Sequence, residues 1–387
     1  MAKVFVIAQG GGPTSVINQT VAGAVIAARQ RYTGARILGA RHGVRGIRDG
    51  TFIDLSDISE TDLRRMGSTP NAALGSTRDK PDEQYCGRIL EQLQKVGASA
   101  LLYIGGNDTA GTLQILNAAG GNRIAFIHGP KTIDNDLVEN DHTPGFISAA
   151  LFVSHAFLSM DLDFRALPGV YVGIVMGRHA GFLTAAAAAW RRAESDGPHL
   201  VYVPERPFST PAFLDDVNAV REKFGRCVVA MSEGVTTADG RPLVESLIGG
   251  TLERDAHGNV QLSTSDLGLA IQAELSKAFP KVRARVDTFG YLPRAFSAAI
   301  SDVDQREAFE VGRYAVTAAA SGSASVTLGD ETGSSTIRAV PLDAVAGKTR
   351  LMPNDFLDPS ANRVSNKGVA YLSRLLPPPP DTYAPFL

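Results

Sequence analysis

Cysteine and net charge are what this 387-residue sequence has least of. Its two cysteines, Cys86 and Cys227, form neither a metal-binding pattern nor a disulfide framework, which predicts a reducing, cytoplasmic setting. The 38 Lys and Arg residues nearly balance the 40 Asp and Glu residues. The charge therefore gives no reason to expect a nucleic acid or an anionic membrane as a partner.

Long hydrophobic runs are also lacking. The first residues, MAKVFVIAQGGG, pass from a short apolar run directly into glycines, so we expect a strand there and no signal peptide. No uninterrupted apolar stretch is long enough to span a membrane. Hydrophobic residues still make up 44% of the chain, an ordinary share for a globular protein, and the length suggests two or more lobes.

Short apolar runs alternate with helix-length segments along the chain. Strands are predicted at residues 3–8, 98–104, 123–128, 169–175 and 227–231, and a helix at residues 15–31. Such alternation is typical of a parallel α/β sheet with right-handed crossovers. Each predicted strand is followed by a glycine-rich or charged turn. Parallel sheets bind ligands outside the carboxyl ends of their strands, so these turns should share one edge.

The first two turns suit phosphate and metal binding. The turn GGGPT at residues 10–14 lets backbone N–H groups approach an anion at a helix start, although a tight structural turn has the same composition. The turn GGNDT at residues 105–109 adds Asn107 and Asp108, whose oxygens are suited to Mg²⁺. Helix N-capping is the alternative for both side chains.

The third turn, PKTIDND at residues 130–136, combines a lysine with two carboxylates. If the segment is extended, Thr132, Asp134 and Asp136 point to one side. A carboxylate there can take a proton from an attacking hydroxyl, and Lys131 can neutralise charge on phosphate oxygens. A capped loop of turn-forming residues is the alternative.

The remaining turns add acidic and basic groups. They contain Met176, Gly177 and Arg178, then Glu233, and then a basic segment with Arg283, Arg285, Tyr291 and Arg294. An arginine at a strand end can bind an oxyanion, although a solvated basic surface is the alternative. The chain has no Walker A sequence and no kinase GxGxxG or HRD pattern. Together the turns indicate phosphoryl transfer, in which catalysis is mostly positioning and charge stabilisation.

The ordered motifs GGGPTSVIN, YIGGNDT, GPKTIDNDL, DHTPGFISAA, VMGRHAGFLTAAAA and MSEG, with the segment 285–294, resemble the phosphofructokinase A family over nearly the whole chain. The resemblance is strongest to the branch that uses pyrophosphate. In ATP-using relatives the second turn reads GGDGS, with glycine where Asp108 stands here, and many also have glycine where Lys131 stands. Side chains at these two positions would fill the space of a nucleotide.

The resemblance implies reversible, Mg²⁺-dependent transfer of a phosphoryl group from pyrophosphate to the 1-hydroxyl of fructose 6-phosphate. It implies catalytic roles for Asp134, the general base, and for Lys131 and Asp108, which set donor choice. It implies that Gly11, Gly106 and Arg78 bind pyrophosphate, that Asn107 lies at the metal, and that Thr132, Asp136, Met176, Gly177, Arg178, Glu233, Arg285, Tyr291 and Arg294 bind the sugar phosphate.

The implied fold is α/β, with two Rossmann-like lobes of mostly parallel sheets and the active site in the cleft. Residues 1–140 would form the larger, pyrophosphate-binding lobe, with later segments returning to it. Residues 141–300 would form the sugar-phosphate lobe, with an insertion near 245–267, and residues 301–387 a C-terminal helix and tail. Because Arg285 would reach the acceptor site of a neighbouring subunit, a homodimer or homotetramer is expected.

Some positions depart from the family pattern. Asn107 stands where the family has an aspartate near Mg²⁺, and Gly169 stands where it usually has an arginine that meets the sugar phosphate. Ile174 replaces a glutamate, Pro293 alters the segment after the tyrosine, and Arg165 is a candidate substitute for the missing arginine. These departures keep three alternatives open: another acceptor such as sedoheptulose 7-phosphate, an ATP-dependent enzyme, and a non-catalytic sugar-phosphate sensor.

Overall fold

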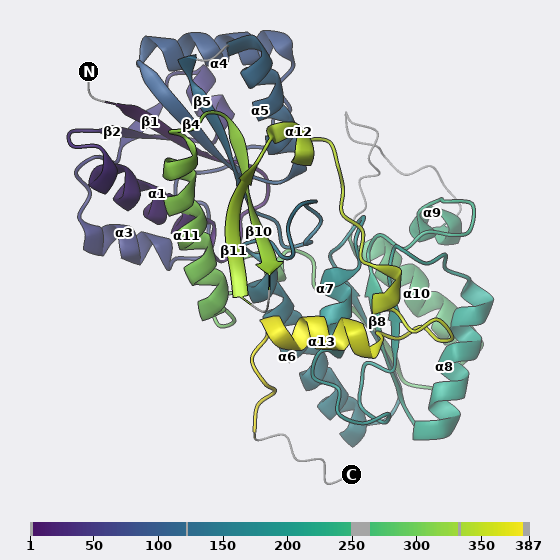
Figure 1. The fold of residues 1–387 in the computed structure, drawn as a ribbon. Coiled ribbons are helices and arrows are strands. Elements are labelled where there is room, and N and C mark those ends of the chain that lie inside the picture. Colours follow the sequence, from purple (N-terminus) through teal and green to yellow (C-terminus); the bar gives the residue numbers. More distant parts are fainter. Residues whose placement is uncertain (1–2, 121–122, 249–263, 332–333, 382–387) are drawn as a thin grey trace. The chain divides into compact units, whose positions relative to one another are not determined.

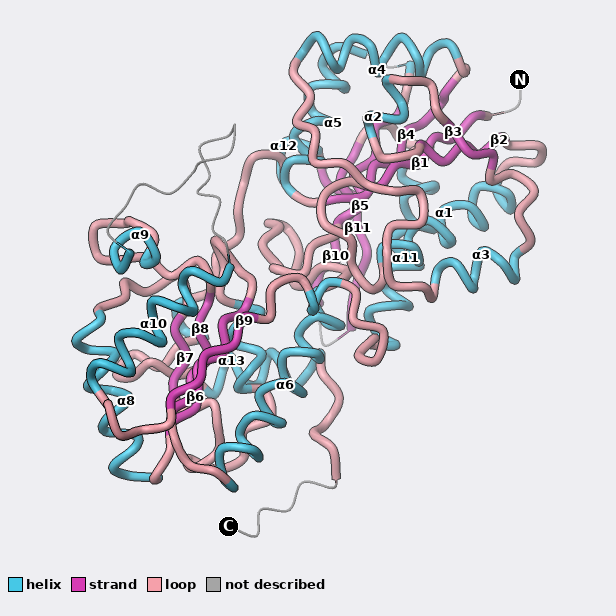
Figure 2. Tube along the Cα trace, turned by 180° about the vertical axis from the view of Figure 1, so that it is seen from behind, coloured by secondary structure: helices cyan, strands magenta, loops and turns pink. Residues whose placement is uncertain are grey.

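The computed structural model describes residues 3–120, 123–248, 264–331 and 334–381 (Figures 1 and 2). The chain forms two compact units. One contains residues 1–149 and 294–350, and the other contains residues 150–293 and 351–387. The chain therefore passes from one unit to the other after residues 149, 293 and 350. Most of the expected insertion near 245–267 lies outside the described residues.

The first unit is built on a seven-stranded sheet with the order β11-β10-β5-β4-β1-β2-β3. Its strands are β1 (Val4–Gln9), β2 (Arg36–Ala40), β3 (Phe52–Asp54), β4 (Ala98–Gly105), β5 (Ala125–Pro130), β10 (Ala324–Glu331) and β11 (Ser334–Val340). Only the outer strands β3 and β11 pair antiparallel with their neighbours, so the central five strands are parallel. Their carboxyl ends therefore lie at one edge of the sheet.

Helices cover both faces of this sheet (Figure 1). They are α1 (Ile17–Arg31), α2 (Val44–Arg48), α3 (Glu60–Gly67), α4 (Glu83–Lys95), α5 (Asn107–Gly120), α11 (Asp302–Ala318) and α12 (Leu342–Val345). Alternate residues of β1 point to opposite faces: Phe5 and Ile7 pack in the core beneath α1 and α11, whereas Val6 and Ala8 pack in the core beneath α4 and α5. This two-sided burial explains why the strand is apolar without interruption.

The second unit is built on a four-stranded, fully parallel sheet with the order β7-β8-β6-β9. Its strands are β6 (Val170–Val175), β7 (Leu200–Tyr202), β8 (Cys227–Ser232) and β9 (Ala284–Thr288). Its helices are most of α6 (Phe146–Ala166), then α7 (Phe182–Ala185), α8 (Thr210–Phe224), α9 (Leu243–Ile248), α10 (Thr264–Ala278) and α13 (Asn366–Leu375), with short 3₁₀ turns at Ala186–Ala188, Leu292–Arg294 and Asn354–Phe356.

The core of the second unit also has two sides. Val172 and Ile174 of β6 pack in the cluster that includes α8 and α10, whereas Tyr171 points to the other face. There its ring lies 6.3 Å from that of Phe157 and 5.4 Å from that of Phe164, both on α6. These aromatic contacts anchor α6 against the sheet.

All five strands predicted from the sequence are confirmed, as is the first helix, with boundaries that differ by no more than two residues. Among the described residues, α6 is the one helix long and apolar enough to cross a membrane by length and composition. In its most apolar window 61% is buried inside the structure. A core helix of a globular protein meets the same criterion, so α6 is weak evidence for membrane insertion.

Candidate functional site

The first glycine turn follows β1 and is fixed by hydrogen bonds from its own backbone. The N–H of Gly10 donates to the carbonyl of Ile104 at 2.8 Å, and the N–H of Gly11 donates to the carbonyl of Thr77 at 3.0 Å. The hydroxyl of Ser76 donates to the carbonyl of Gly11 at 2.6 Å. Gly11 has a φ of 72°, in the left-handed region where a side chain is strained, so the turn requires glycine there.

The helix that follows this turn begins without a side-chain cap. Its N-cap residue is Val16, which makes no capping hydrogen bond, and its first turn holds no acidic residue. First-turn N–H groups of a helix are donors that attract anions, helped by the helix dipole. The helix start therefore lacks a capping side chain and an acidic residue next to the turn at residues 10–14, and phosphate binding at this turn stays a prediction.

The second glycine turn, between β4 and α5, is tight at one glycine and open at the next. A Cβ at Gly105 would lie 2.1 Å from the Thr109 hydroxyl, so no side chain fits. A Cβ at Gly106 would meet only the carbonyl of Lys131, at 3.8 Å. Next to this open space, the Oδ1 atom of Asn107 is buried and has no hydrogen-bond partner among the described residues. Buried carbonyl oxygens are seldom left unpaired without a reason, so this one is suited to a ligand or a cation.

Lys131 lies where the two glycine turns meet. Its side chain is 5% exposed, and its ammonium group donates to the carbonyl of Gly12 at 2.6 Å. The same nitrogen would lie 3.4 Å from a Cβ at Gly11. The guanidinium of Arg294 is also at this turn, because its carbon would lie 2.8 Å from a Cβ at Gly12. Two cations therefore flank one glycine turn.

The pKa of Lys131 reports the charges around it. Burial lowers this pKa to about 8, and the nearby positive charges of Arg294 and Arg78 lower it as well. The carboxylates of Asp134 and Asp136 oppose the shift. The structure thus gathers Arg78, Lys131, Asp134, Asp136 and Arg294 into one electrostatic cluster around the first turn. Arg294, assigned by resemblance to the sugar phosphate, lies in the first unit beside these donor-side residues.

The loop that carries the two carboxylates is bent at its centre. Asn135 is fully buried and has a φ of 57°, in the left-handed region that asparagine tolerates better than most residues. The extended geometry considered for residues 132–136 is therefore wrong. The backbone N–H of Asp134 instead donates to the Thr132 hydroxyl at 3.1 Å, as in a turn. Both Asp134 and Asp136 are half-buried.

The DHTPGF segment at residues 141–146, called the strap below, is hydrogen-bonded to this loop. The N–H of Thr132 donates to the carbonyl of Pro144 at 3.3 Å, and the hydroxyl of Thr143 donates to the carbonyl of Thr132 at 3.0 Å. On the far side, the N–H of Arg350 donates to the carbonyl of Asp136 at 2.8 Å. These contacts fix both ends of the bend, so the strap positions the loop.

Two buried ionisable residues that the sequence analysis missed support the strap. Both ring nitrogens of His142 bond to carboxylates, at 2.8 Å from Asp141 and 2.7 Å from Glu307. Burial opposes the charge on this ring, but these hydrogen bonds raise the pKa of His142 to about 9. The buried carboxyl of Asp304 accepts a hydrogen bond from the N–H of Gly145 at 2.8 Å. Burial raises the pKa of this carboxyl to about 6, although the hydrogen bonds that it accepts oppose the shift. Glu307 and Asp304 lie in α11, far away in sequence.

His128 supports the second glycine turn from inside β5 and was also missed. Its Nε2 atom lies 2.9 Å from the carbonyl of Gly105, and its Nδ1 atom lies 2.8 Å from the Ser325 hydroxyl. A carbonyl only accepts, so Nε2 carries the proton and Nδ1 accepts from the serine. Burial lowers the pKa of His128 to about 4, which keeps the ring neutral near pH 7. The sequence signal that could have revealed this role is a polar residue, His128, in an otherwise apolar strand.

We expect His128→Leu to destabilise the fold by about 1–3 kcal/mol, because it leaves a buried carbonyl and a buried hydroxyl with fewer partners. His128→Gln keeps an N–H at the reach of Nε2, so it should lose less. Urea unfolding of the two variants and the wild type measures the difference. Equal stability of the Leu and Gln variants would contradict this account of the Gly105 contact.

In the second unit, the turns after β6 and β8 approach each other closely. A Cβ at Gly234 would lie 2.2 Å from the carbonyl of Arg178, and the Ser232 hydroxyl donates to the carbonyl of Gly177. The Arg178 guanidinium lies 3.7 Å from the carboxylate of Glu233, which is 9% exposed. Met176 is buried beside them. The structure therefore brings Met176, Gly177, Arg178 and Glu233 together at the carboxyl ends of adjacent parallel strands.

Arg285 and Tyr291 lie apart from this group within the second unit. Arg285 lies on the edge strand β9 at the register of Tyr171, whereas the strand ends at the register of Ile174. Its guanidinium donates to the carbonyl of Ala284 at 2.8 Å, and its side chain is exposed. Tyr291 is 63% exposed. Both side chains thus remain accessible in the described chain.

The departure at Gly169 has a physical reason. A Cβ there would lie 2.3 Å from the backbone carbonyl of Arg283, so an arginine does not fit at this position. Arg165 bonds to Asp161 at 3.0 Å and to Asp196 at 2.6 Å, and its side chain is 7% exposed. This buried pairing holds Arg165 in the core, which makes it a poor substitute for the absent arginine.

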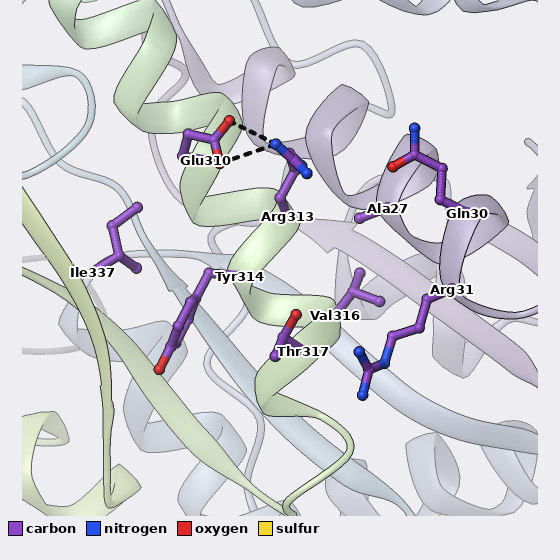
Figure 3. A pocket seen from close by; sticks show the side chains of 9 residues that line it. All are labelled: Ala27, Gln30, Arg31, Glu310, Arg313, Tyr314, Val316, Thr317 and Ile337. Carbon is purple, nitrogen blue, oxygen red and sulfur yellow. Dashed lines mark hydrogen bonds and ion pairs between the residues drawn. The ribbon is translucent and has the colours of Figure 1, made fainter.

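The first unit also has a surface hollow that is lined by none of these residues (Figure 3). It has a volume of about 590 Å³ and lies between α1, α11 and β11. It is lined by Ala27, Gln30, Arg31, Glu310, Arg313, Tyr314, Val316, Thr317 and Ile337. Arg313 is paired with Glu310 at 3.1 Å, and none of the nine residues belongs to a motif. The hollow is therefore not the candidate site.

Comparison with known proteins gives consistent results. Residues 4–319 match the family described as Phosphofructokinase. The chain is 49% identical to the pyrophosphate–fructose 6-phosphate 1-phosphotransferase of Rhodospirillum rubrum over 96% of this chain and 93% of that protein. It is 34% identical to the protein of that name from Xanthomonas campestris pv. campestris over 95% and 90%. The crystal structure of a pyrophosphate-dependent phosphofructokinase from Nitrosospira multiformis matches with a TM-score of 0.86 and 28% identity over 99% of this chain and 95% of that one.

Proposed function

Since the chain belongs to the phosphofructokinase family and has its α/β fold, we propose that it transfers a phosphoryl group from inorganic pyrophosphate to the 1-hydroxyl of fructose 6-phosphate. The products are fructose 1,6-bisphosphate and orthophosphate, and the reaction is reversible. The observation that carries the choice of donor is the position of Lys131, whose ammonium group occupies the first glycine turn at 2.6 Å from the carbonyl of Gly12. Its charge there suits a compact, highly charged donor.

The pyrophosphate site that we propose lies in the first unit. Gly11 and Gly106 leave room for pyrophosphate to approach the backbone of the two turns, and Arg78 and Lys131 neutralise its oxygens. Asp108 lies in the first turn of α5, next to the second glycine turn, where it takes up space that a nucleotide needs. A carboxylate and a lysine in these places favour a small inorganic donor over ATP.

The catalytic step needs a base and stabilised charge. We assign the base to Asp134, whose carboxylate takes the proton from the sugar hydroxyl as the hydroxyl oxygen attacks the nearer phosphorus of pyrophosphate. The bond from that phosphorus to the bridging oxygen breaks, and orthophosphate leaves with the electron pair. Lys131 holds the negative charge that develops on the transferred group and the leaving group.

Enzymes of this family generally use Mg²⁺, and the residues present fit such an ion. The unpartnered Oδ1 of Asn107 is a suitable oxygen ligand. Among the described residues no group of three or more His, Cys, Asp and Glu side chains could hold a metal, which suits an ion held mainly by donor phosphates and water. When bound, the ion would neutralise charge on the phosphate oxygens.

For the sugar phosphate we propose one set of residues in each unit. Thr132, Asp136 and Arg294 come from the first, and Met176, Gly177, Arg178, Glu233, Arg285 and Tyr291 come from the second. Arginine side chains suit the phosphate of the sugar, and carboxylates suit its hydroxyls. Because Arg285 is exposed and lies apart from Arg178, we propose that it serves a neighbouring copy in a homodimer or homotetramer in the cytoplasm.

The pH dependence of donor binding should follow Lys131. Its pKa is lowered to about 8, so the ammonium form that attracts pyrophosphate is lost as the pH rises through that value. We expect kcat/KM for pyrophosphate to fall by about tenfold per pH unit above pH 8 relative to a Lys131→Arg variant, since arginine stays charged. Steady-state kinetics gives kcat/KM for both proteins at each pH, and the ratio of the two values is independent of the ionisation of pyrophosphate. If kcat/KM of the two proteins changed with pH in the same way, the role of Lys131 would be contradicted.

Gly169 favours one alternative acceptor. A sugar phosphate of another length, such as sedoheptulose 7-phosphate, would not need the arginine that this chain lacks. An acceptor panel with pyrophosphate and Mg²⁺, read as kcat/KM for each sugar phosphate, tests the assignment. If kcat/KM is highest for fructose 6-phosphate, the proposed acceptor is supported. If it is clearly highest for sedoheptulose 7-phosphate, that sugar phosphate is the acceptor instead.

A further inference from the structure

Lys80 lies on a loop that touches both glycine turns of the first unit. Upstream of it, the carbonyl of Thr77 accepts from the N–H of Gly11 at 3.0 Å, which ties the loop to the first turn. Downstream, the Lys80 ammonium lies 3.4 Å from the Asp108 carboxylate at the start of α5, which ties it to the second turn. This loop therefore places a cation where the donor is proposed to bind.

The residue before Lys80 is held by contacts of its own. The Asp79 carboxylate accepts from the guanidinium of Arg45 at 3.1 Å and from the hydroxyl of Tyr85 at 2.8 Å. The guanidinium of Arg45 holds the pKa of this carboxyl well below its usual range. The Asp79 carboxylate is therefore directed towards α2 and α4, whereas the ammonium group of Lys80 is directed towards Asp108.

Asp108 presents an electrostatic difficulty for its own proposed role. A carboxylate that blocks a nucleotide also repels pyrophosphate, which is itself strongly negative. The side chain of Asp108 is 73% exposed and that of Lys80 is 37% exposed, so their pair adds little to the stability of the fold. The ion pair should instead change the affinity for a charged ligand that binds next to it.

We propose that Lys80 is a specificity-determining residue for the phosphoryl donor. Its ammonium group neutralises the Asp108 carboxylate, so Asp108 obstructs a nucleotide while the turn still accepts inorganic pyrophosphate. This inference rests on the proposed pyrophosphate-dependent function. It differs from direct donor binding, because Lys80 acts through Asp108 and should become dispensable when that charge is removed.

A double-mutant cycle tests the inference. Inorganic pyrophosphate with Mg²⁺ is titrated calorimetrically into the wild type, Lys80→Met, Asp108→Asn and the double variant, with Lys95→Met as an exposed-lysine control on α4. Lys80→Met should weaken binding about tenfold in the wild-type background and about twofold or less in the Asp108→Asn background. The tenfold loss should shrink in high salt, which a purely structural effect would not do. Thermal melts check that each variant is folded.

The outcomes separate this inference from the proposed function. Equal losses in both backgrounds, or no loss, would overturn the role of Lys80 while leaving pyrophosphate binding intact. Coupled losses with no turnover of fructose 6-phosphate would support Lys80 and overturn the acceptor assignment. Failure of the folded wild type to bind pyrophosphate would overturn both.

Discussion

Asp134→Asn should lower kcat for phosphoryl transfer by about a thousandfold, since a positioned general base typically contributes 10²–10⁴-fold and the amide cannot accept the proton. The variant keeps the size of the side chain and the backbone hydrogen bond from Asp134 to the Thr132 hydroxyl, so the loop should retain its bend. The lost carboxylate also removes one of the charges that raise the pKa of Lys131, which adds to the effect at alkaline pH. Steady-state kinetics with pyrophosphate at pH 7 gives kcat directly.

A matched control makes this result specific to the site. Asp57→Asn makes the same chemical change on an exposed residue between β3 and α3 and should leave kcat within about twofold. Calorimetric melts of both variants establish that they are folded. If Asp134→Asn retained more than a tenth of the wild-type kcat, Asp134 would not be the base. The carboxylate of Asp136 would then be the next to test.

Gly169→Arg, which restores the usual residue of the family, should prevent folding, and Gly169→Ala should lower the free energy of unfolding by about 1–3 kcal/mol through overpacking. A Cβ at this position would lie 2.3 Å from the Arg283 carbonyl. The backbone cannot move away cheaply, because the N–H of Val170 donates to that same carbonyl at 2.8 Å and the carbonyl of Gly169 accepts from Cys227 at 2.9 Å. These hydrogen bonds therefore join the starts of β6, β8 and β9 next to Gly169.

Urea unfolding of Gly169→Ala measures this expectation, with Gly87→Ala as the control. Gly87 lies in α4, and a Cβ there would have no atom within 4 Å, so alanine should stabilise the helix by up to about 1 kcal/mol. If the free energy of unfolding falls in Gly169→Ala and rises in Gly87→Ala, the close approach of the Arg283 carbonyl to Gly169, and not glycine replacement in general, causes the loss. A Gly169→Ala variant as stable as the wild type would contradict it. In that case the missing arginine would need an explanation other than space.

The sequence predicted the strands and the turns after them because both depend on local patterns. Continuous apolar runs such as that of β1 reveal strands buried on both faces, and parallel topology then gathers the turns at one edge. Lys131 beside Gly12 follows from that topology. The close pairing of Arg178 with Glu233 follows from it as well, since β6 and β8 are neighbours in the second sheet.

What the sequence could not provide depends on contacts between distant residues. Nothing local predicts that Asp304 bonds to the N–H of Gly145, or that His128 bonds to Ser325. The bend at Asn135 was missed because asparagine adopts extended and left-handed conformations, and the surroundings decide between them. Arg294 was assigned to the sugar phosphate by resemblance alone, without any signal that it lies next to Gly12.

We propose that Lys131 and Asp108 make this protein a pyrophosphate-dependent enzyme. The most direct test is the formation of fructose 1,6-bisphosphate from fructose 6-phosphate and Mg²⁺, with either pyrophosphate or ATP as the sole phosphoryl donor. We predict turnover with pyrophosphate and none above background with ATP. Turnover with ATP at a comparable kcat/KM would contradict the claim, because the two side chains would then not exclude the nucleotide.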